Sequence, residues 1–192
     1  MLPSITAKYD IILGSKSPRR KELLKHLIKD FGIQVKPVNE KYPNNLKREK
    51  IAVFLSELKA KEFNPIGNQL IITADTIVVL NDLVLGKPVD KNDAFKMLKT
   101  LSGNTHEVIT ACTLYSQENF STFYDITEVT FYALSDEEII SYINQCNPLD
   151  KAGSYGIQEW MGYVGIKKMN GEFFNVMGLP LHKLYRELKK IC

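Results

Sequence analysis

Residues 70–80 read LIITADTIVVL, the most strand-like stretch in the chain. Aliphatic and β-branched side chains fall on both faces of the predicted strand. Such a pattern is typical of a strand that lies in the middle of a sheet and is covered on both sides. We therefore expect this stretch to form a buried central strand.

Asp75 stands in the middle of this apolar stretch. A carboxylate in such surroundings destabilises the fold unless it is paired with a cation, hydrogen-bonded or bound to a metal. Asp75 is therefore a candidate functional residue. The alternative is an aspartate at the end of the strand that faces water or accepts hydrogen bonds from the backbone.

The chain opens with a second strand pattern at residues 9–13, followed by the loop GSKSPRR at residues 14–20. Ser17 is a favoured N-cap residue, and Pro18 suits the first position of a helix. The order of strand, tight loop and helix predicts the start of an α/β unit.

Later segments continue the alternation of helices and strands. A helix is predicted over residues 48–63, another after Asp90, and a third after Ser135, where Ser135 and Glu138 form a capping box. Asn170-Gly171 is a strong hairpin signal, so residues 164–169 and 173–176 are expected to pair as strands.

The composition describes an ordinary globular protein of 192 residues, and the length fits a single domain over residues 1–192. A net charge of +3 argues against a nucleic-acid-binding protein. Cys112, Cys146 and Cys192 match no zinc pattern and indicate a reduced protein. No apolar run reaches the roughly 18 residues of a membrane span, so the protein is expected in the cytoplasm without a membrane partner.

The loop at residues 14–20 carries the strongest signal for an anion. Ser15 and Ser17 supply hydroxyl groups, and Lys16, Arg19 and Arg20 supply positive charge beside a predicted helix N-terminus. Backbone N–H groups and the helix dipole favour phosphate at such a place, and arginine binds phosphate oxygens in a bidentate manner. The loop lacks the Gly-Lys-Ser/Thr ending of a Walker A motif. A capped surface helix with solvated charges is the alternative.

Two further segments carry candidate residues. Lys87, within Gly86-Lys87-Pro88, could reach the same place as Asp75 through a turn at residues 81–82, although a lone lysine in a turn is usually solvated. Residues 150–159 read DKAGSYGIQE, and Gln158 offers both a donor and an acceptor, as recognition of a base edge requires. An ordinary glycine-rich loop with an exposed amide is the alternative.

Five motifs in this order resemble the Maf family, over most of the chain from Ile11 to Leu188. They are residues 15–20, residues 74–78 with 85–88, residues 97–103 with 106–108, residues 150–158 and residues 175–180. Lys16 departs from the glycine that is usual between the two serines.

This resemblance implies an α/β fold with a mixed, bent central sheet flanked by helices, and two lobes around a cleft. It implies hydrolysis of a nucleoside triphosphate to the monophosphate and pyrophosphate with Mg²⁺ or Mn²⁺, and a homodimer. Asp75 matches the family's proposed general base, and Asp75 and Glu40 match positions at the metal. The positions that surround the phosphates are matched by Ser15, Arg20, Lys59 and Lys87, of which Lys87 joins Asp75 as a predicted catalytic residue.

The resemblance also implies a substrate. Members with Gly-Ile-Gln in the loop at residues 150–158 resemble the dTTP/UTP pyrophosphatases, and Arg19, Thr76 and Gln158 match the positions tied to pyrimidine preference. Glu159-Trp160 departs from the small residues that usually follow this glutamine. A 7-methyl-GTP pyrophosphatase of the same family and a non-catalytic nucleotide-binding regulator of division are the alternatives.

Overall fold

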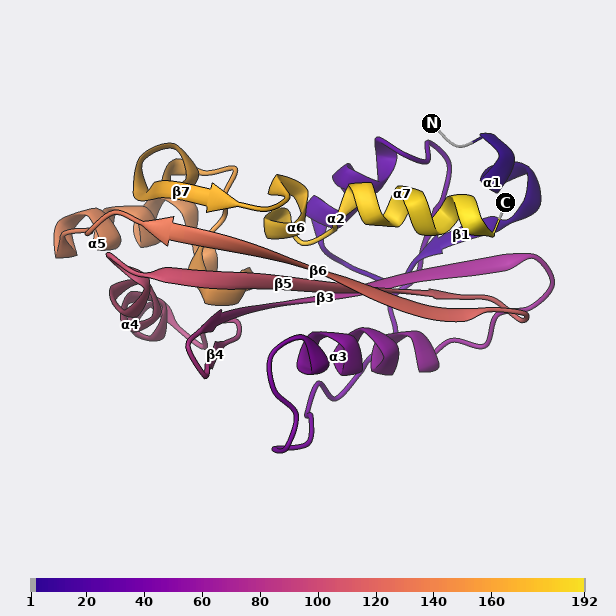
Figure 1. Cartoon of the computed structure of the whole chain (residues 1–192), viewed down its shortest axis with the longest axis horizontal. Coiled ribbons are helices and arrows are strands. Elements are labelled where there is room, and N and C mark those ends of the chain that lie inside the picture. The colour runs from indigo at the N-terminus through magenta and orange to yellow at the C-terminus, as the bar shows by residue number, and fades with distance from the viewer. Residues whose placement is uncertain (1–2, 192) are drawn as a thin grey trace. The chain divides into compact units, whose positions relative to one another are not determined.

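The computed structural model describes residues 3–191 (Figure 1). Its α-helices are α1 (Pro3–Lys8), α2 (Pro18–Lys25), α3 (Glu49–Lys61), α4 (Lys91–Leu101), α5 (Asp136–Cys146), α6 (Phe173–Met177) and α7 (Leu181–Lys190). Its strands are β1 (Asp10–Leu13), β2 (Gly32–Ile33), β3 (Gln69–Leu80), β4 (Leu83–Leu85), β5 (Thr105–Tyr115), β6 (Phe120–Phe131) and β7 (Ile166–Asn170). Short 3₁₀ turns at Pro148–Asp150 and Ala152–Ser154 and a π-helical turn at Met161–Gly165 complete the set.

Over the described residues, the strands form one mixed sheet in the order β2-β1-β3-β5-β6-β7, with β4 paired to β3. Strand β1 runs parallel to both β2 and β3, whereas β4 and β7 run antiparallel to β3 and β6. The predicted buried central strand is confirmed as β3, and the prediction of a mixed α/β sheet flanked by helices is confirmed as well. No helix of residues 3–191 is long and apolar enough to cross a membrane.

The chain divides into two compact units, and the division falls inside β3, β5 and β6. The first unit holds the described residues of Met1–Asp75, Thr110–Asp125 and Gly178–Cys192, and the second holds Thr76–Ile109 and Ile126–Met177. Asp75 is thus the last residue of its unit on β3, and Thr76 opens the other. The single domain over residues 1–192 and the cleft between lobes both stay predictions.

In the first unit, helices cover both sides of the strands, with α3 on one side and α7 on the other (Figure 1). Helix α7 buries Leu181, Leu184 and Leu188, which recur at the spacing of one helical face. Helix α3 buries Ala52, Leu55, Ser56 and Ala60 in the same way. Because Ser56 and Ala60 point inward, the half-buried Lys59 stands at the edge of the buried face of α3, where it can reach β3.

The second unit has its own apolar core, to which β3, α4, β5, β6 and α5 contribute. Among its buried residues are Val78, Leu98, Val108, Phe131 and Tyr142. The caps predicted for α4 and α5 are confirmed: Asp90 Oδ1 accepts a hydrogen bond from Asp93 N at 2.7 Å, and Ser135 forms the full capping box with Glu138.

The predicted hairpin at Asn170-Gly171 is wrong. Strand β7 does end at Asn170, but the next element is helix α6 rather than a returning strand. The Asn175 amide donates hydrogen bonds to Val108 O and to Thr127 Oγ1, both at 2.9 Å, and Glu172 N donates to Thr127 Oγ1 at 3.1 Å. These contacts tie the segment to β5 and β6 in a helical conformation, and they are invisible in the local turn signal.

Candidate active site

The loop after β1 carries two serine hydroxyls, and the predicted N-cap at Ser17 is confirmed. Ser17 caps α2 with an extended backbone, and its Oγ accepts a hydrogen bond from Arg20 N at 3.4 Å. The buried Ser15 Oγ accepts from Ser17 N at 3.2 Å and from Arg20 Nη1 at 3.5 Å. The loop therefore holds Ser15, Ser17 and Arg20 together at the start of a helix, where a phosphate is favoured.

Arg20 is held in place from the far end of the chain. Its Nε donates to Gly178 O at 2.8 Å. Gly178 has a φ of +105°, a backbone conformation that residues other than glycine rarely adopt. Burial lowers the pKa of Arg20, and the charges of Asp75 and Glu40 oppose this effect. Because arginine starts so far above neutrality, it remains a cation. The guanidinium is a preorganised positive charge close to two carboxylates.

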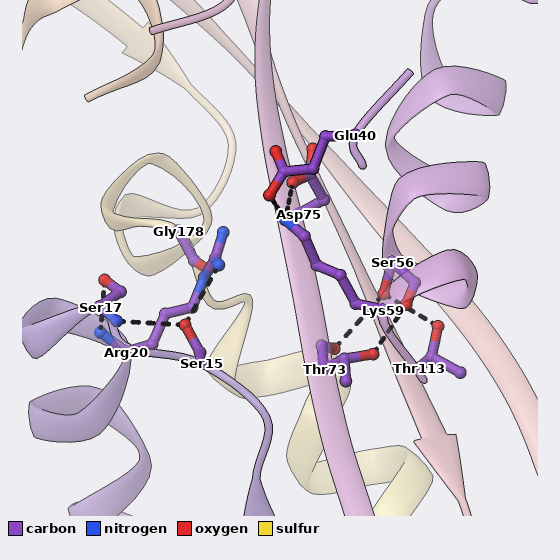
Figure 2. A network of polar contacts seen from close by, with 10 residues as sticks. All are labelled: Ser15, Ser17, Arg20, Glu40, Ser56, Lys59, Thr73, Asp75, Thr113 and Gly178. Atoms are coloured by element: carbon purple, nitrogen blue, oxygen red, sulfur yellow. Dashed lines mark hydrogen bonds and ion pairs between the residues drawn. The ribbon is translucent and has the colours of Figure 1, made fainter. Parts of the chain in front are cut away.

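Lys59 joins the two predicted metal residues. Its Nζ lies 2.5 Å from Asp75 Oδ1 and 3.1 Å from Glu40 Oε1 (Figure 2). The side chain of Asp75 is only 9% exposed and that of Lys59 14%, whereas that of Glu40 is 46% exposed. The carboxylate of the apolar strand is thus paired with a cation, as its burial required.

A network of hydroxyl groups locks α3 against β3 beneath this trio (Figure 2). Thr73 Oγ1 donates to Ser56 O at 2.8 Å, and Ser56 Oγ lies 2.9 Å from Thr113 Oγ1. Thr73 precedes Asp75 by two residues on the same face of β3, and Ser56 precedes Lys59 by about one helical turn. The network therefore fixes where the ammonium meets the carboxylate. A serine among the buried positions of α3 was the one sequence signal for it.

The residues fit a divalent cation that takes some of its ligands from the protein and the rest from a phosphate group and water. No group of three or more His, Cys, Asp or Glu side chains in residues 3–191 could hold a metal alone. Asp75 and Glu40, however, already share one cation, the ammonium of Lys59. Carboxylate oxygens suit Mg²⁺ and Mn²⁺, and Mg²⁺ is commonly bound by one or two carboxylates together with phosphate oxygens and water.

The buried Cys112 is no candidate nucleophile. Burial raises the pKa of its thiol to about 12, although the charge of Arg20 acts in the opposite direction. A thiol of this kind stays protonated and inert. Cys112 and Cys146 are both free, and Cys192 lies outside the described residues.

The remaining predicted residues are distributed between the two units. Arg19 is half-buried in the first turn of α2. In the second unit, Thr76 is half-buried, and Lys87 is exposed two residues after the paired end of β4, where Leu85 faces Val78. The first unit alone therefore brings together Ser15, Ser17 and Arg20 in one cluster and Glu40, Lys59 and Asp75 in another (Figure 2).

Gln158 occupies a turn of the second unit and is half-buried. Its Oε1 is buried and, among the described residues, has no hydrogen-bond partner. An unpaired buried acceptor is unfavourable in the protein alone, so a donor that reached this oxygen would stabilise it. The sequence predicted the residue, but its acceptor geometry comes from the fold.

Comparison with known proteins agrees with the resemblance seen in the sequence. The model of the Maf family, which is described as Maf-like protein, matches residues 10–191. A dTTP/UTP pyrophosphatase of Porphyromonas gingivalis is 49% identical over 187 residues, which are 95% of this chain and 94% of the relative. A dTTP/UTP pyrophosphatase of Phocaeicola vulgatus is 50% identical over 187 residues, which are 96% of this chain and 97% of the relative.

Among solved structures, the Ham1 protein of Staphylococcus aureus has a similar fold. The TM-score is 0.54 at 14% sequence identity, and the match covers 95% of this chain and 100% of that protein. At this identity the likeness concerns the fold alone, and it agrees with the mixed, helix-flanked sheet described above.

Proposed function

Because this chain belongs to the Maf family, we propose that it is a nucleoside triphosphate pyrophosphatase that converts dTTP and UTP to their monophosphates and pyrophosphate. Relatives that share about half of its residues carry the name of this activity. The observation that carries the proposal is the buried Asp75, held with Glu40 on one cation beside the preorganised Arg20. This arrangement suits an attack by water on a polyphosphate.

Asp75 is the proposed general base. It would accept a proton from the water that attacks the α-phosphorus, while the bond to the bridging oxygen breaks and pyrophosphate leaves. Asp75 and Glu40 would hold the Mg²⁺ or Mn²⁺ ion, which when bound neutralises charge on the phosphate oxygens. In the absence of substrate the ammonium of Lys59 pairs with the Asp75 carboxylate, so the buried charge has a partner.

The cationic residues are proposed to stabilise the negative charge that builds up on the phosphates. Arg20 is already fixed by Ser15 and Gly178, so it needs no rearrangement when the charge develops. Ser17, Arg19 and Lys87 are proposed as further phosphate contacts, with Lys87 in a catalytic role.

Gln158 is proposed to read the base. Thymine and uracil present an imide N–H, which the buried Oε1 of Gln158 can accept, whereas cytosine presents an acceptor at the same ring position. A site built around an acceptor discriminates against the base that lacks the donor. Arg19 and Thr76 are proposed to assist in this preference.

The first test is pyrophosphate release by the purified protein with Mg²⁺ or Mn²⁺ and a panel of dTTP, UTP, CTP, GTP and 7-methyl-GTP. We expect rapid release from dTTP and UTP only. Release from 7-methyl-GTP alone would keep the reaction and overturn the role of Gln158. Nucleotide binding without any release would favour a regulator that lacks catalysis.

We propose further that residues 1–192 act as one catalytic domain in the cytoplasm, as a homodimer, and bind neither nucleic acid nor membrane. The free thiols of Cys112 and Cys146 support a reducing compartment. Light scattering of the purified protein tests the homodimer.

A further inference from the structure

The glutamine proposed to read the base lies in a segment held by an unusual set of contacts. Gln158 stands between Gly156 and Glu159, three residues before the start of the π-helical turn at Met161–Gly165. Its buried Oε1 has no partner among the described residues, so no hydrogen bond to that atom orients the amide. Neighbouring groups must therefore fix where this acceptor points.

One tyrosine hydroxyl closes a ring around Gln158. Tyr142 donates a hydrogen bond to Glu159 Oε2 at 2.6 Å and accepts one from Gly156 N at 2.9 Å. Gly156 is two residues before Gln158, and Glu159 is one residue after it. The hydroxyl thus joins both sides of the turn to helix α5.

The other oxygen of Glu159 is held as well. Lys151 Nζ lies 3.1 Å from Glu159 Oε1 and 2.9 Å from Asp150 Oδ1. The side chain of Lys151 is 8% exposed and that of Glu159 is 22% exposed, so water screens the pair weakly. With Tyr142 on one oxygen and Lys151 on the other, the Glu159 carboxylate has little rotational freedom.

The direction of these hydrogen bonds is fixed by the chemistry of Tyr142. Only 1% of this residue is exposed, and burial together with the hydrogen bond to Glu159 raises the pKa of its phenol. The phenol therefore remains a donor at any physiological pH, and its single proton points to Glu159. Tyr142 belongs to the apolar core of the second unit, so the hydrogen bonds around Gln158 are anchored to that core.

The side chains of Gln158 and Glu159 fold over Gly156. A Cβ atom added there would lie 2.8 Å from Glu159 Cδ, 2.9 Å from Glu159 Oε2 and 3.1 Å from Gln158 Nε2. The carboxylate and the amide are therefore packed over one glycine backbone. We therefore expect a shift of the carboxylate to loosen the packing of the amide.

We propose that Glu159 and Tyr142 are positioning residues that hold the amide of Gln158 in its base-reading orientation, and so help to set the choice of base. The inference rests on the proposed function, because it assigns specificity within that site. It gives a role to Glu159, which departs from the small residues expected after the glutamine.

The decisive variant is Tyr142→Phe, which removes one hydroxyl and leaves the buried ring in place. We expect the ratio of kcat/KM for UTP to that for CTP to fall about fivefold, the worth of one hydrogen bond. The loss should appear mainly as a higher KM for UTP, because contacts with the base bind ground state and transition state alike. Glu159→Ala should act in the same way.

The ratio is a safe readout because both nucleotides report on the same folded molecules, so a partly unfolded preparation leaves it unchanged. Tyr132→Phe is the matched control, since Tyr132 lies in the same unit and is 52% exposed. We expect it to behave as the wild type. In a Gln158→Ala background, Tyr142→Phe should not change the ratio further, because the two residues act through one contact.

The outcomes separate the inference from the function. If the wild type hydrolyses UTP and Tyr142→Phe keeps the wild-type ratio, the inference is overturned and the function stands. An equal additional drop in the Gln158→Ala background would also overturn it, because Tyr142 would then act elsewhere. If the wild type hydrolyses no nucleotide, the proposed function fails. The inference is then decided by calorimetry, which compares the UTP-to-CTP ratio of binding constants in the wild type and in Tyr142→Phe. An unchanged ratio, or absence of nucleotide binding, would overturn the inference.

Discussion

Two lysines of this protein each lie between two carboxylates, and the two trios differ in how far along the chain they reach. Lys59 contacts Asp75 at 2.5 Å and Glu40 at 3.1 Å, which brings together a loop, α3 and β3. Lys151 contacts Asp150 at 2.9 Å and Glu159 at 3.1 Å within a single segment. The first trio joins charged side chains from three separate elements, whereas the second joins charged side chains within residues 150–159.

The carboxylates also differ in their other partners. Glu159 is fixed by Tyr142, so its charge serves the structure around it. Glu40 is nearly half exposed, and together with Asp75 it places two negative charges around one ammonium. In the roles proposed here, the same set of charges prepares a reaction in one trio and positions a neighbour in the other, because the surrounding contacts differ. Four variants test this distinction.

The largest effect is expected for Asp75→Asn. The change keeps the size of the side chain but removes the proposed base, and we expect kcat to fall on the order of 10²–10³-fold. Steady-state release of pyrophosphate measures it, and circular dichroism confirms the fold. Glu159→Gln, the equivalent change in the other trio, should alter kcat far less. Near wild-type turnover of Asp75→Asn would remove Asp75 from the mechanism.

Lys151→Met is expected to affect stability rather than chemistry. It leaves Glu159 without its cation in a poorly solvated place, and breaking such a pair destabilises by about 3 kcal/mol. Chemical unfolding measures the free energy, with Lys99→Met as the control, because the Lys99–Asp136 pair is more than half exposed on both sides. Equal losses in the two variants would mean that burial of the Lys151 pair contributes nothing.

Lys59→Met should strengthen metal binding in the absence of nucleotide. The ammonium occupies the carboxylates that are proposed to bind the ion, so its removal should raise the affinity for Mn²⁺ about tenfold. Electron paramagnetic resonance of free Mn²⁺ gives the affinity without any turnover. Lys151→Met should leave it unchanged. An unaltered affinity in Lys59→Met would show that the metal binds elsewhere.

Gln158→Ala carries the smallest effect. Removing the acceptor should lower the preference for UTP over CTP by about fivefold, with little change in kcat, because one hydrogen bond to the base is lost. The ratio of kcat/KM values measures it. A preference equal to that of the wild type would place recognition of the base on other residues.

The features that the sequence predicted correctly are those with local causes. The apolar stretch around Asp75 is a buried strand, and Ser17, Asp90 and Ser135 cap the helices that follow them. The need of the Asp75 carboxylate for a partner also follows from its position within an apolar stretch of sequence. Helix α1 was not predicted, because its six residues carry no clear periodic pattern.

The features that could not be predicted depend on contacts between distant residues. The lock between Ser56 and Thr113 joins residues 57 positions apart, and although Ser56 stands among the buried positions of α3, no local pattern pairs it with Thr113. The ring around Gln158 requires Tyr142, which in the sequence looks like any core tyrosine of a helix. The boundary between the two units falls inside strands, so it has no linker composition to reveal it.

The bond between Arg20 and Gly178 has a consequence for biosynthesis. Arg20 is held by a carbonyl that the ribosome adds 158 residues later. A nascent chain therefore carries Arg20 long before Gly178 can hold it, so the proposed phosphate site is completed only after residue 178 has been added. A chain that stops before Gly178 lacks this acceptor and cannot hold the Arg20 guanidinium by this contact.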